Sequence, residues 1–246
     1  MRVLLTGGSG RLGSELAALL GQDQHALAAP SSTELDVRDQ GAFSAQAAEF
    51  APDVIVHAAA YTDVKGAEDD KVTCWSVNVL GTRNAALAAR EAGAKLVHIS
   101  TDYVFWGDRG DYGEDDVPGP VRNYYALTKL VAEEAARAAP SHLVIRTSFR
   151  PRRWEYPVAF ADLYTSQDYV DVIAPEIAAA VVNSGRIAYH TLHIATERKS
   201  VLELARRRAP DVKEGRRADT SVPLPQDVSL NSARWRALKR TWEDEA

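Results

Sequence analysis

Two kinds of segment alternate through the first 150 residues, and this alternation limits the possible folds more than any other feature of the chain. The strand-length apolar runs are Arg2–Thr6, His25–Ala29, Asp53–Ala58, Lys95–Ser100 and His142–Thr147. The Ala- and Leu-rich segments of helical length between them are Arg11–Leu20, Gln40–Phe50, Ala67–Ala92 and Tyr124–Ala138. Strands that alternate with helices form a parallel sheet with helices on both faces. The predicted fold class is therefore α/β, with a doubly wound parallel sheet.

The regular alternation ends after Arg150. The later segments are a basic, aromatic loop over Pro151–Pro157, helices over Asp171–Val182, Glu197–Arg208 (capped by Thr196) and Asn231–Arg240, a strand within Arg186–Ile194, and a connector over Asp219–Asp227. We therefore expect a first domain over residues 1–150 and a small C-terminal α+β lobe over residues 151–246. Part of the segment 171–195 is expected to return and complete the sheet.

Composition narrows the class of protein. The net charge is −5, 46% of the residues are hydrophobic, and the only cysteine is Cys74, so no internal disulfide can form. The chain enters its first strand without the features of a signal peptide, and no apolar run approaches the roughly 20 residues that span a bilayer. We expect a cytoplasmic protein without a membrane partner.

Basic residues gather near the C-terminus, where the segment 197–240 holds twelve Lys or Arg against six Asp or Glu. These charges fall within predicted helices, and no nucleic-acid-binding motif accompanies them, so we expect no nucleic-acid partner. A solvated helix face and a site for a small anion are the two interpretations that stay open.

A glycine-rich turn follows the first predicted strand and precedes the first predicted helix. Gly7, Gly10 and Gly13 allow a tight turn there and let backbone amides approach a pyrophosphate, to which the helix N-terminus adds partial positive charge. A flexible loop is the alternative, but the position after the first strand of a βαβ series favours a dinucleotide site. The first domain is therefore predicted to be a Rossmann-type, NAD(P)-binding domain.

The glycine spacing resembles that of the short-chain dehydrogenase/reductase superfamily. In that superfamily, an Asp-Val pair like Asp36-Val37 contacts the adenine ring, and small residues like Ala58–Ala60 let the cofactor lie against the third strand. The alternatives are a helix cap for Asp36 and plain strand packing for the alanines.

The end of the second strand bears on the choice between NAD and NADP. Ser31 and Ser32 offer hydroxyl groups and no acid, while Arg11 is near enough in sequence to reach a 2′-phosphate, unless it is simply exposed on the first helix. This favours NADP slightly over NAD. The predicted cofactor-binding residues are Gly7, Ser9, Gly10, Arg11, Leu12, Gly13, Ser31, Ser32, Asp36, Val37, Ala58, Ala59, Ala60, Tyr125 and Lys129.

A phenol and an ammonium lie one turn apart on a predicted helix, as Tyr125 and Lys129, and Thr101 ends the strand before it. Ketone reduction needs a proton donor for oxygen, and a phenol with a pKa of about 10 is a weak acid at neutral pH. A Lys cation about 4 Å away stabilises the phenolate by roughly 4 kcal/mol, which predicts a Tyr125 pKa near 7. We therefore predict that Thr101, Tyr125 and Lys129 are catalytic, against the alternative of a surface Tyr–Lys contact beside a capping Thr.

Further segments narrow the resemblance to extended short-chain reductases similar to dTDP-4-dehydrorhamnose reductase. These segments are His57–Thr62, Val77–Thr82, His98–Phe105, Tyr125–Lys129 and Ile145–Ser148. The resemblance implies an NAD(P)H-dependent reductase of a nucleotide-sugar 4-ketone. It also implies that the small-molecule substrate lies against Thr101, Asp102 and Phe149, and that the C-terminal region with Arg216, Arg217, Arg234 and Arg236 closes over a nucleotide diphosphate.

The chain departs from the family pattern after Ser148, where Phe149–Trp154 intervenes and some tens of residues of the substrate-binding lobe are missing. Two other functions therefore stay open: an NAD-dependent sugar-nucleotide epimerase or dehydratase, and a non-catalytic NAD(P)-binding regulatory subunit. No metal site is predicted, and a homodimer is left open.

Overall fold

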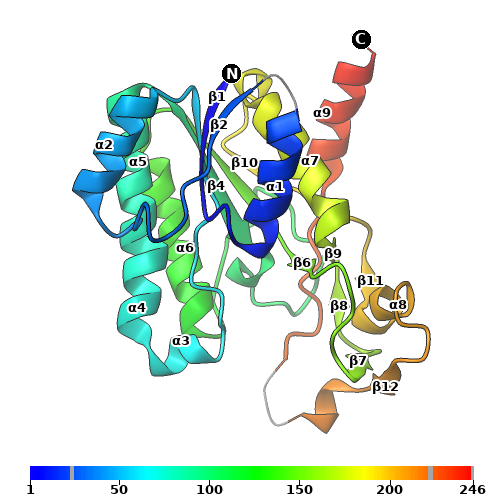
Figure 1. Cartoon of the computed structure of the whole chain (residues 1–246). Helices are drawn as coiled ribbons and strands as arrows, with labels where there is room; N and C mark the ends of the chain where they lie inside the picture. Colours follow the sequence, from blue (N-terminus) through cyan, green and yellow to red (C-terminus); the bar gives the residue numbers. More distant parts are fainter. Residues whose placement is uncertain (23–24, 221–223, 245–246) are drawn as a thin grey trace.

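The computed structural model describes residues 1–22, 25–220 and 224–244. Its centre is a six-stranded parallel sheet in the spatial order β2-β1-β3-β4-β5-β10 (Figure 1). The strands are β1 (Arg2–Thr6), β2 (Ala26–Ala28), β3 (Val54–His57), β4 (Lys95–Thr101), β5 (His142–Thr147) and β10 (Thr191–His193). The predicted doubly wound α/β class is confirmed, and β10 lies within the segment from which we expect a returning strand.

Helices cover both faces of the sheet, and alternate side chains of each strand pack against them. On one face α1 (Arg11–Gln22) and α7 (Val170–Val182) lie together, and α2 (Gln40–Phe50), α5 (Gly81–Ala92) and α6 (Tyr124–Arg137) cover the other (Figure 1). Val3 and Leu5 of β1 belong to the core under α1, whereas Leu4 between them belongs to the opposite core. Alternate side chains of the strand thus pack against the helices on opposite faces of the sheet.

The helix predicted over Ala67–Ala92 is interrupted, so that prediction is wrong. The segment forms α3 (Gly66–Asp69), α4 (Lys71–Trp75), a π-helical turn (Ser76–Leu80) and then α5. Asp70 leaves the helical conformation at φ −119° and ψ 70°, and its carboxylate caps α4 by accepting a hydrogen bond from Thr73 N at 3.0 Å. The π turn places Asn78 in the interior, where its amide donates to Thr128 Oγ1 of α6 at 2.9 Å.

The helix predicted over Glu197–Arg208 is also wrong at its start, because α8 spans Val201–Arg206. Ser200 is the cap: its hydroxyl accepts from Glu203 N, and the Glu203 carboxylate accepts from Ser200 N. The Thr196 hydroxyl instead donates to Ser166 O at 3.1 Å.

The C-terminal lobe is built from short paired strands around a small core of its own. The pairs are β6 (Phe149–Arg150) with β9 (Asp168–Tyr169), β7 (Val158–Phe160) with β12 (Lys213–Gly215), and β8 (Tyr164–Thr165) with β11 (Lys199–Ser200). Short 3-10 turns lie at Asp102–Val104, Ser184–Arg186 and Arg217–Asp219, and α9 runs over Ala233–Glu243. Residues 221–223 of the predicted connector lie outside the described residues.

Among the described residues, no helix combines the length and the apolar character that crossing a membrane requires.

Candidate active site

A cleft of about 1010 Å³ runs along the carboxyl ends of β1, β3, β4 and β5 and continues against the C-terminal lobe. The order of the sheet reverses at β1, because β2 pairs with one of its edges and β3 with the other. In open α/β sheets a ligand binds at such a reversal point, outside the carboxyl ends of the strands. The position of the cleft is therefore that of a ligand site.

Two positions of the glycine turn, Gly7 and Gly13, have no room for a side chain. Gly7 has φ +74°, and a Cβ there would lie 2.6 Å from Ala59 N; a Cβ at Gly13 would lie 1.9 Å from Gly7 O. Gly10 N donates to Gly7 O at 2.9 Å, and α1 begins at the next residue, so its unpaired amides lie at the turn. The turn thus fits the close approach of a pyrophosphate.

Most of the other predicted cofactor contacts lie along the same cleft. The residues in its wall include Ser9, Arg11, Leu12, Ser32, Asp36, Val37, Ala58, Ala59, Ala60, Tyr125 and Lys129. Ser31 does not line the cleft: its hydroxyl lies 2.9 Å from Thr33 Oγ1 and donates to Glu34 Oε2 at 2.8 Å. The acid Glu34 therefore lies near the end of β2, and the sequence interpretation missed this acid. Asp36 pairs with Arg38 at 2.6 Å, and hydrogen bonds from Arg38 lower the pKa of the Asp36 carboxyl.

Thr101, Tyr125 and Lys129 all line the cleft, and a side-chain hydrogen bond joins Thr101 to Tyr125. Thr101 is the last residue of β4, and Tyr125 and Lys129 lie one turn apart in α6, whose N-terminus is capped by Asn123 accepting from Ala126 N at 2.8 Å. The Lys129 side chain is only 3% exposed, and its Nζ donates to Ile99 O at 2.7 Å. The alternative of a surface Tyr–Lys contact does not fit this burial.

The expected lowering of the Tyr125 pKa is not found, and the structure gives the opposite direction. Burial raises the pKa of Tyr125, the negative charge of Asp102 raises it further, and a hydrogen bond with Thr101 acts weakly the other way. Burial also lowers the pKa of Lys129 to about 8, with the Glu133 carboxylate opposing that shift. The sequence argument assumed a partly solvated pair, whereas desolvation dominates in the folded protein.

A buried ion pair lies beneath these residues. Arg146 of β5 donates to both Glu133 oxygens, from Nε and from a terminal nitrogen, at 2.9 Å in each case. Ser100 Oγ, one residue before Thr101, donates to Glu133 Oε1 at 2.6 Å. The pair ties α6 to β4 and β5 directly behind the catalytic candidates.

The half of the cleft beside the lobe contains the predicted substrate contacts Asp102 and Phe149. It also contains Arg150, Tyr156 and Gln167, which the sequence interpretation did not assign. The basic and aromatic stretch after Ser148 is the sequence signal for Arg150 and Tyr156, and it does not extend to Gln167. Burial raises the pKa of Asp102 to about 7, against hydrogen bonds with Thr101 and Ser148 and the positive charge of Arg150.

The four C-terminal arginines expected over a diphosphate are not found in the wall of this cleft, as far as the structure describes it. Arg234 pairs with Asp115 at 2.6 Å, and Arg217 N donates to Asp162 Oδ1 at 2.8 Å. Arg236 lines a separate groove between α7 and α9, and Arg216 is exposed.

Together the sheet, the glycine turn and the cleft define a Rossmann-type α/β protein with a dinucleotide-type site. A family model described as "RmlD substrate binding domain" matches residues 1–207, and the chain belongs to this family. A dTDP-4-dehydrorhamnose reductase of Mycobacterium tuberculosis is 36% identical over 178 residues, covering 70% of this chain and 54% of that protein. The chain thus spans about half the length of such curated relatives.

Solved structures agree in fold over nearly the whole chain. A crystal structure of dTDP-4-dehydrorhamnose reductase from Bacillus anthracis in complex with NADP has a TM-score of 0.86 at 27% identity and covers 96% of this chain and 92% of that one. A hypothetical dTDP-4-dehydrorhamnose reductase from Sulfolobus tokodaii has a TM-score of 0.84 at 33% identity and covers 97% and 94%.

Proposed function

We propose that the protein is an NADPH-dependent reductase of a nucleotide-sugar 4-ketone, with Tyr125 as the proton donor. The observation that carries the proposal is the meeting of the glycine turn with Thr101, Tyr125 and Lys129 along one cleft. The relatives named above support the substrate class.

The chain's own residues supply positioning and proton transfer in this proposal. Bound NADPH supplies the hydride. The half-buried Tyr125 is protonated at neutral pH, because its pKa is raised, and it donates its proton to the substrate carbonyl oxygen as that oxygen becomes an alkoxide. The Thr101 hydroxyl orients the same oxygen. Lys129, mostly charged below pH 8, stabilises the phenolate left on Tyr125.

Three features support NADP as the cofactor over NAD. Arg11 is exposed in the glycine turn, where a guanidinium suits a 2′-phosphate. The acid beside β2, Glu34, is already bonded to Ser31, and the relative from Bacillus anthracis was solved with NADP. On the same proposal the reaction takes place in the cytoplasm.

The test is NADPH oxidation by the purified protein with dTDP-4-keto-6-deoxy sugars. Tyr125→Phe is expected to lower turnover by about 10²–10⁴-fold while NADPH binding is kept, because it removes only the acidic hydroxyl. Tyr124→Phe, its neighbour on α6, is the matched control and is expected to keep full activity. NADPH binding without turnover of any nucleotide-sugar ketone would refute the reductase. Retained NAD without net oxidation would instead favour the epimerase or dehydratase, and a role that survives Tyr125→Phe would favour the regulatory subunit.

A further inference from the structure

Arg150 places a positive charge in the wall of the cleft, beside the catalytic candidates. It lies on β6, where it pairs with Tyr169 of β9, and its side chain is half-buried. Its Nε is buried and has no hydrogen-bond partner among the described residues. A buried N–H group without a partner costs free energy, so such a group in a ligand cleft calls for an explanation.

Aromatic rings flank the Arg150 guanidinium. Its central carbon lies 5.2 Å from the centroid of the Tyr156 ring and 5.6 Å from that of Trp154. Rings at this distance attract a cation through their faces, but they do not replace an acceptor for its N–H groups. The rings therefore hold the guanidinium in place and leave donors free for a ligand.

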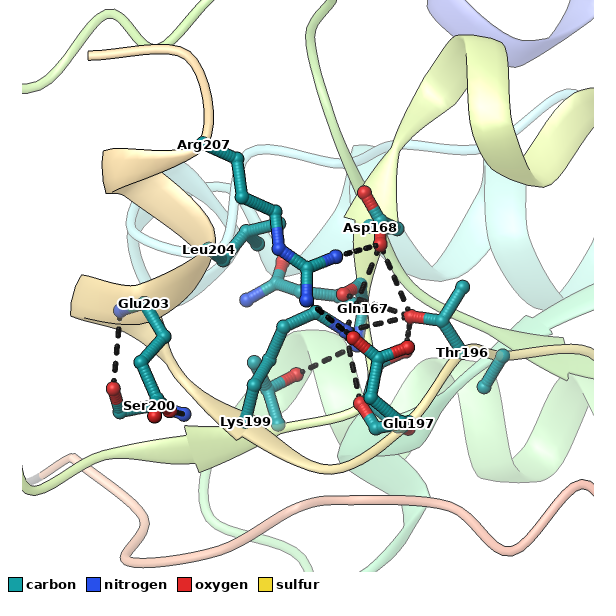
Figure 2. Close-up of polar contacts among 12 residues, drawn as sticks. Gln167, Asp168, Thr196, Glu197, Lys199, Ser200, Glu203, Leu204 and Arg207 are labelled. Atoms are coloured by element: carbon teal, nitrogen blue, oxygen red, sulfur yellow. Dashed lines mark hydrogen bonds and ion pairs between the residues drawn. The ribbon is translucent and has the colours of Figure 1, made fainter. Parts of the chain in front are cut away.

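The carboxylate on the strand paired with β6 is already used by other cations. Asp168 accepts a hydrogen bond from Arg207 at 3.0 Å, lies 3.6 Å from the buried Lys199 Nζ, and also accepts from the Thr196 hydroxyl at 3.2 Å (Figure 2). Glu197 is the second acid of this cluster and contacts both cations, and among the described residues no ion pair joins Arg150 to either carboxylate.

Asp102 is the other acid near Arg150, and it does not neutralise the guanidinium. The positive charge of Arg150 acts on Asp102, yet no ion pair within 4 Å joins the two among the described residues. The Asp102 carboxyl accepts from the Thr101 hydroxyl at 3.1 Å, and burial raises its pKa to about 7, so it is only partly charged at neutral pH. Arg150 keeps most of its charge uncompensated at the reacting end of the cleft.

We infer that Arg150 binds an oxyanion of the substrate, a phosphate or a carboxylate, close to the carbonyl group that Tyr125 protonates. A guanidinium pairs with either oxyanion through two parallel hydrogen bonds, and none of the four C-terminal arginines lines this cleft to compete for it. The inference rests on the proposed function, because it assumes that the substrate enters this half of the cleft. The oxyanion belongs either to the diphosphate of a nucleotide sugar or to a carboxylate on its sugar ring.

Calorimetric binding to the NADP-loaded protein separates the two sources. The probes are dTDP-glucose, which carries only the diphosphate, dTDP-glucuronate, which adds a ring carboxylate, and thymidine, which carries neither. Arg150→Gln is expected to weaken both sugar nucleotides at least about tenfold if the diphosphate is the partner, and dTDP-glucuronate alone if it is the carboxylate. Arg150→Lys keeps the charge without the planar fork and is expected to fall between wild type and Arg150→Gln.

Arg153→Gln is the matched control, since Arg153 is an exposed arginine of the loop that follows β6, and its affinities are expected to stay within about twofold of wild type. Affinities of Arg150→Gln equal to those of wild type, including no binding by either protein, would overturn the inference. Because binding is measured without turnover, a weaker Arg150→Gln together with an inactive wild type would reject the reductase and keep the anion site.

Discussion

Replacing Arg146 by Met tests how strongly the core depends on the ion pair behind the site. Both side chains of the pair are almost fully buried, Glu133 at 1% and Arg146 at 2% exposure. Met keeps the apolar stem of Arg146, but it removes both hydrogen bonds to Glu133 and the guanidinium, whose central carbon lies 5.1 Å from the centroid of the Phe105 ring. The carboxylate then has Ser100 Oγ as its one close donor, with an Arg137 nitrogen 3.6 Å away.

A buried charge that loses its partner costs about 3–5 kcal/mol, a large part of the 5–15 kcal/mol that holds a typical domain folded. The double variant Glu133→Gln with Arg146→Met removes both charges and leaves an amide oxygen for Ser100. It is therefore expected to be more stable than the sum of the two single changes predicts.

Urea denaturation of the four proteins of this cycle measures the effect. With a slope of about 1–3 kcal/mol per molar urea, the midpoint of Arg146→Met is expected to fall by at least about 1 M. Arg109→Met, which breaks the exposed pair with Asp116, is the control and is expected to cost under about 1 kcal/mol. A cost for Arg146→Met as small as that of the control, or a double variant equal to the sum of the singles, refutes the reasoning.

Three more predictions concern the glycine turn, the Lys129 ammonium and the C-terminal lobe. Gly13→Ala places a Cβ 1.9 Å from Gly7 O and is expected to abolish NADPH binding, measured by fluorescence. The control Gly185→Ala, whose new Cβ has no atom within 4 Å, is expected to keep NADPH binding. Normal binding by Gly13→Ala would contradict the tight turn. With a Lys129 pKa of about 8, the kcat/KM of the proposed reduction is expected to fall as pH rises through 8, because the Lys129 ammonium loses its proton. A kcat/KM that falls only near pH 10 would contradict this. Asp168→Asn removes the buried one of the two carboxylates that Lys199 and Arg207 share, and leaves only the exposed Glu197. It is expected to cost about 3 kcal/mol, seen as a lower Tm, and an unchanged Tm argues against the cluster in Figure 2.

The middle strands of the central sheet were predictable from sequence because burial on both faces leaves a continuous apolar run, whereas the short strands of the C-terminal lobe were not predicted. All four residues of β3 are buried, and its predicted run differs from it by one residue at each end. The interruption at Asp70 was not predictable from periodicity, because a residue that ends one helix and caps the next keeps the same polar spacing. Thr196 and Ser200 are both sound helix caps by sequence, and only the pairing of Lys199–Ser200 with β8 decides between them.

The candidate site was predictable where a local motif carries it and not where distant segments meet. Gly7 follows the last residue of β1, Thr101 ends β4 and Tyr125 lies in the first turn of α6, so their common edge follows from topology. The direction of the Tyr125 pKa depends on how much water the folded chain excludes, and Arg150 enters the cleft through the pairing of β6 with β9. Neither is a property of the local sequence.

Lys129 shows that the site and the stability of the fold make opposite demands. Lowering its pKa from 10.5 to about 8 means that the charged form is disfavoured in the folded protein by something on the order of 3 kcal/mol at neutral pH. Lys129→Met is therefore expected to raise the free energy of unfolding at pH 7 while it abolishes the proposed turnover. Between pH 8 and 10.5 the unfolded chain binds more protons at this residue than the folded one, so wild-type stability gains with pH from this group. The advantage of Lys129→Met in urea denaturation is thus expected to shrink from pH 7 to pH 10. A stability advantage that stays constant with pH, or a variant less stable than wild type at pH 7, would show that the buried Lys129 ammonium does not destabilise the folded protein.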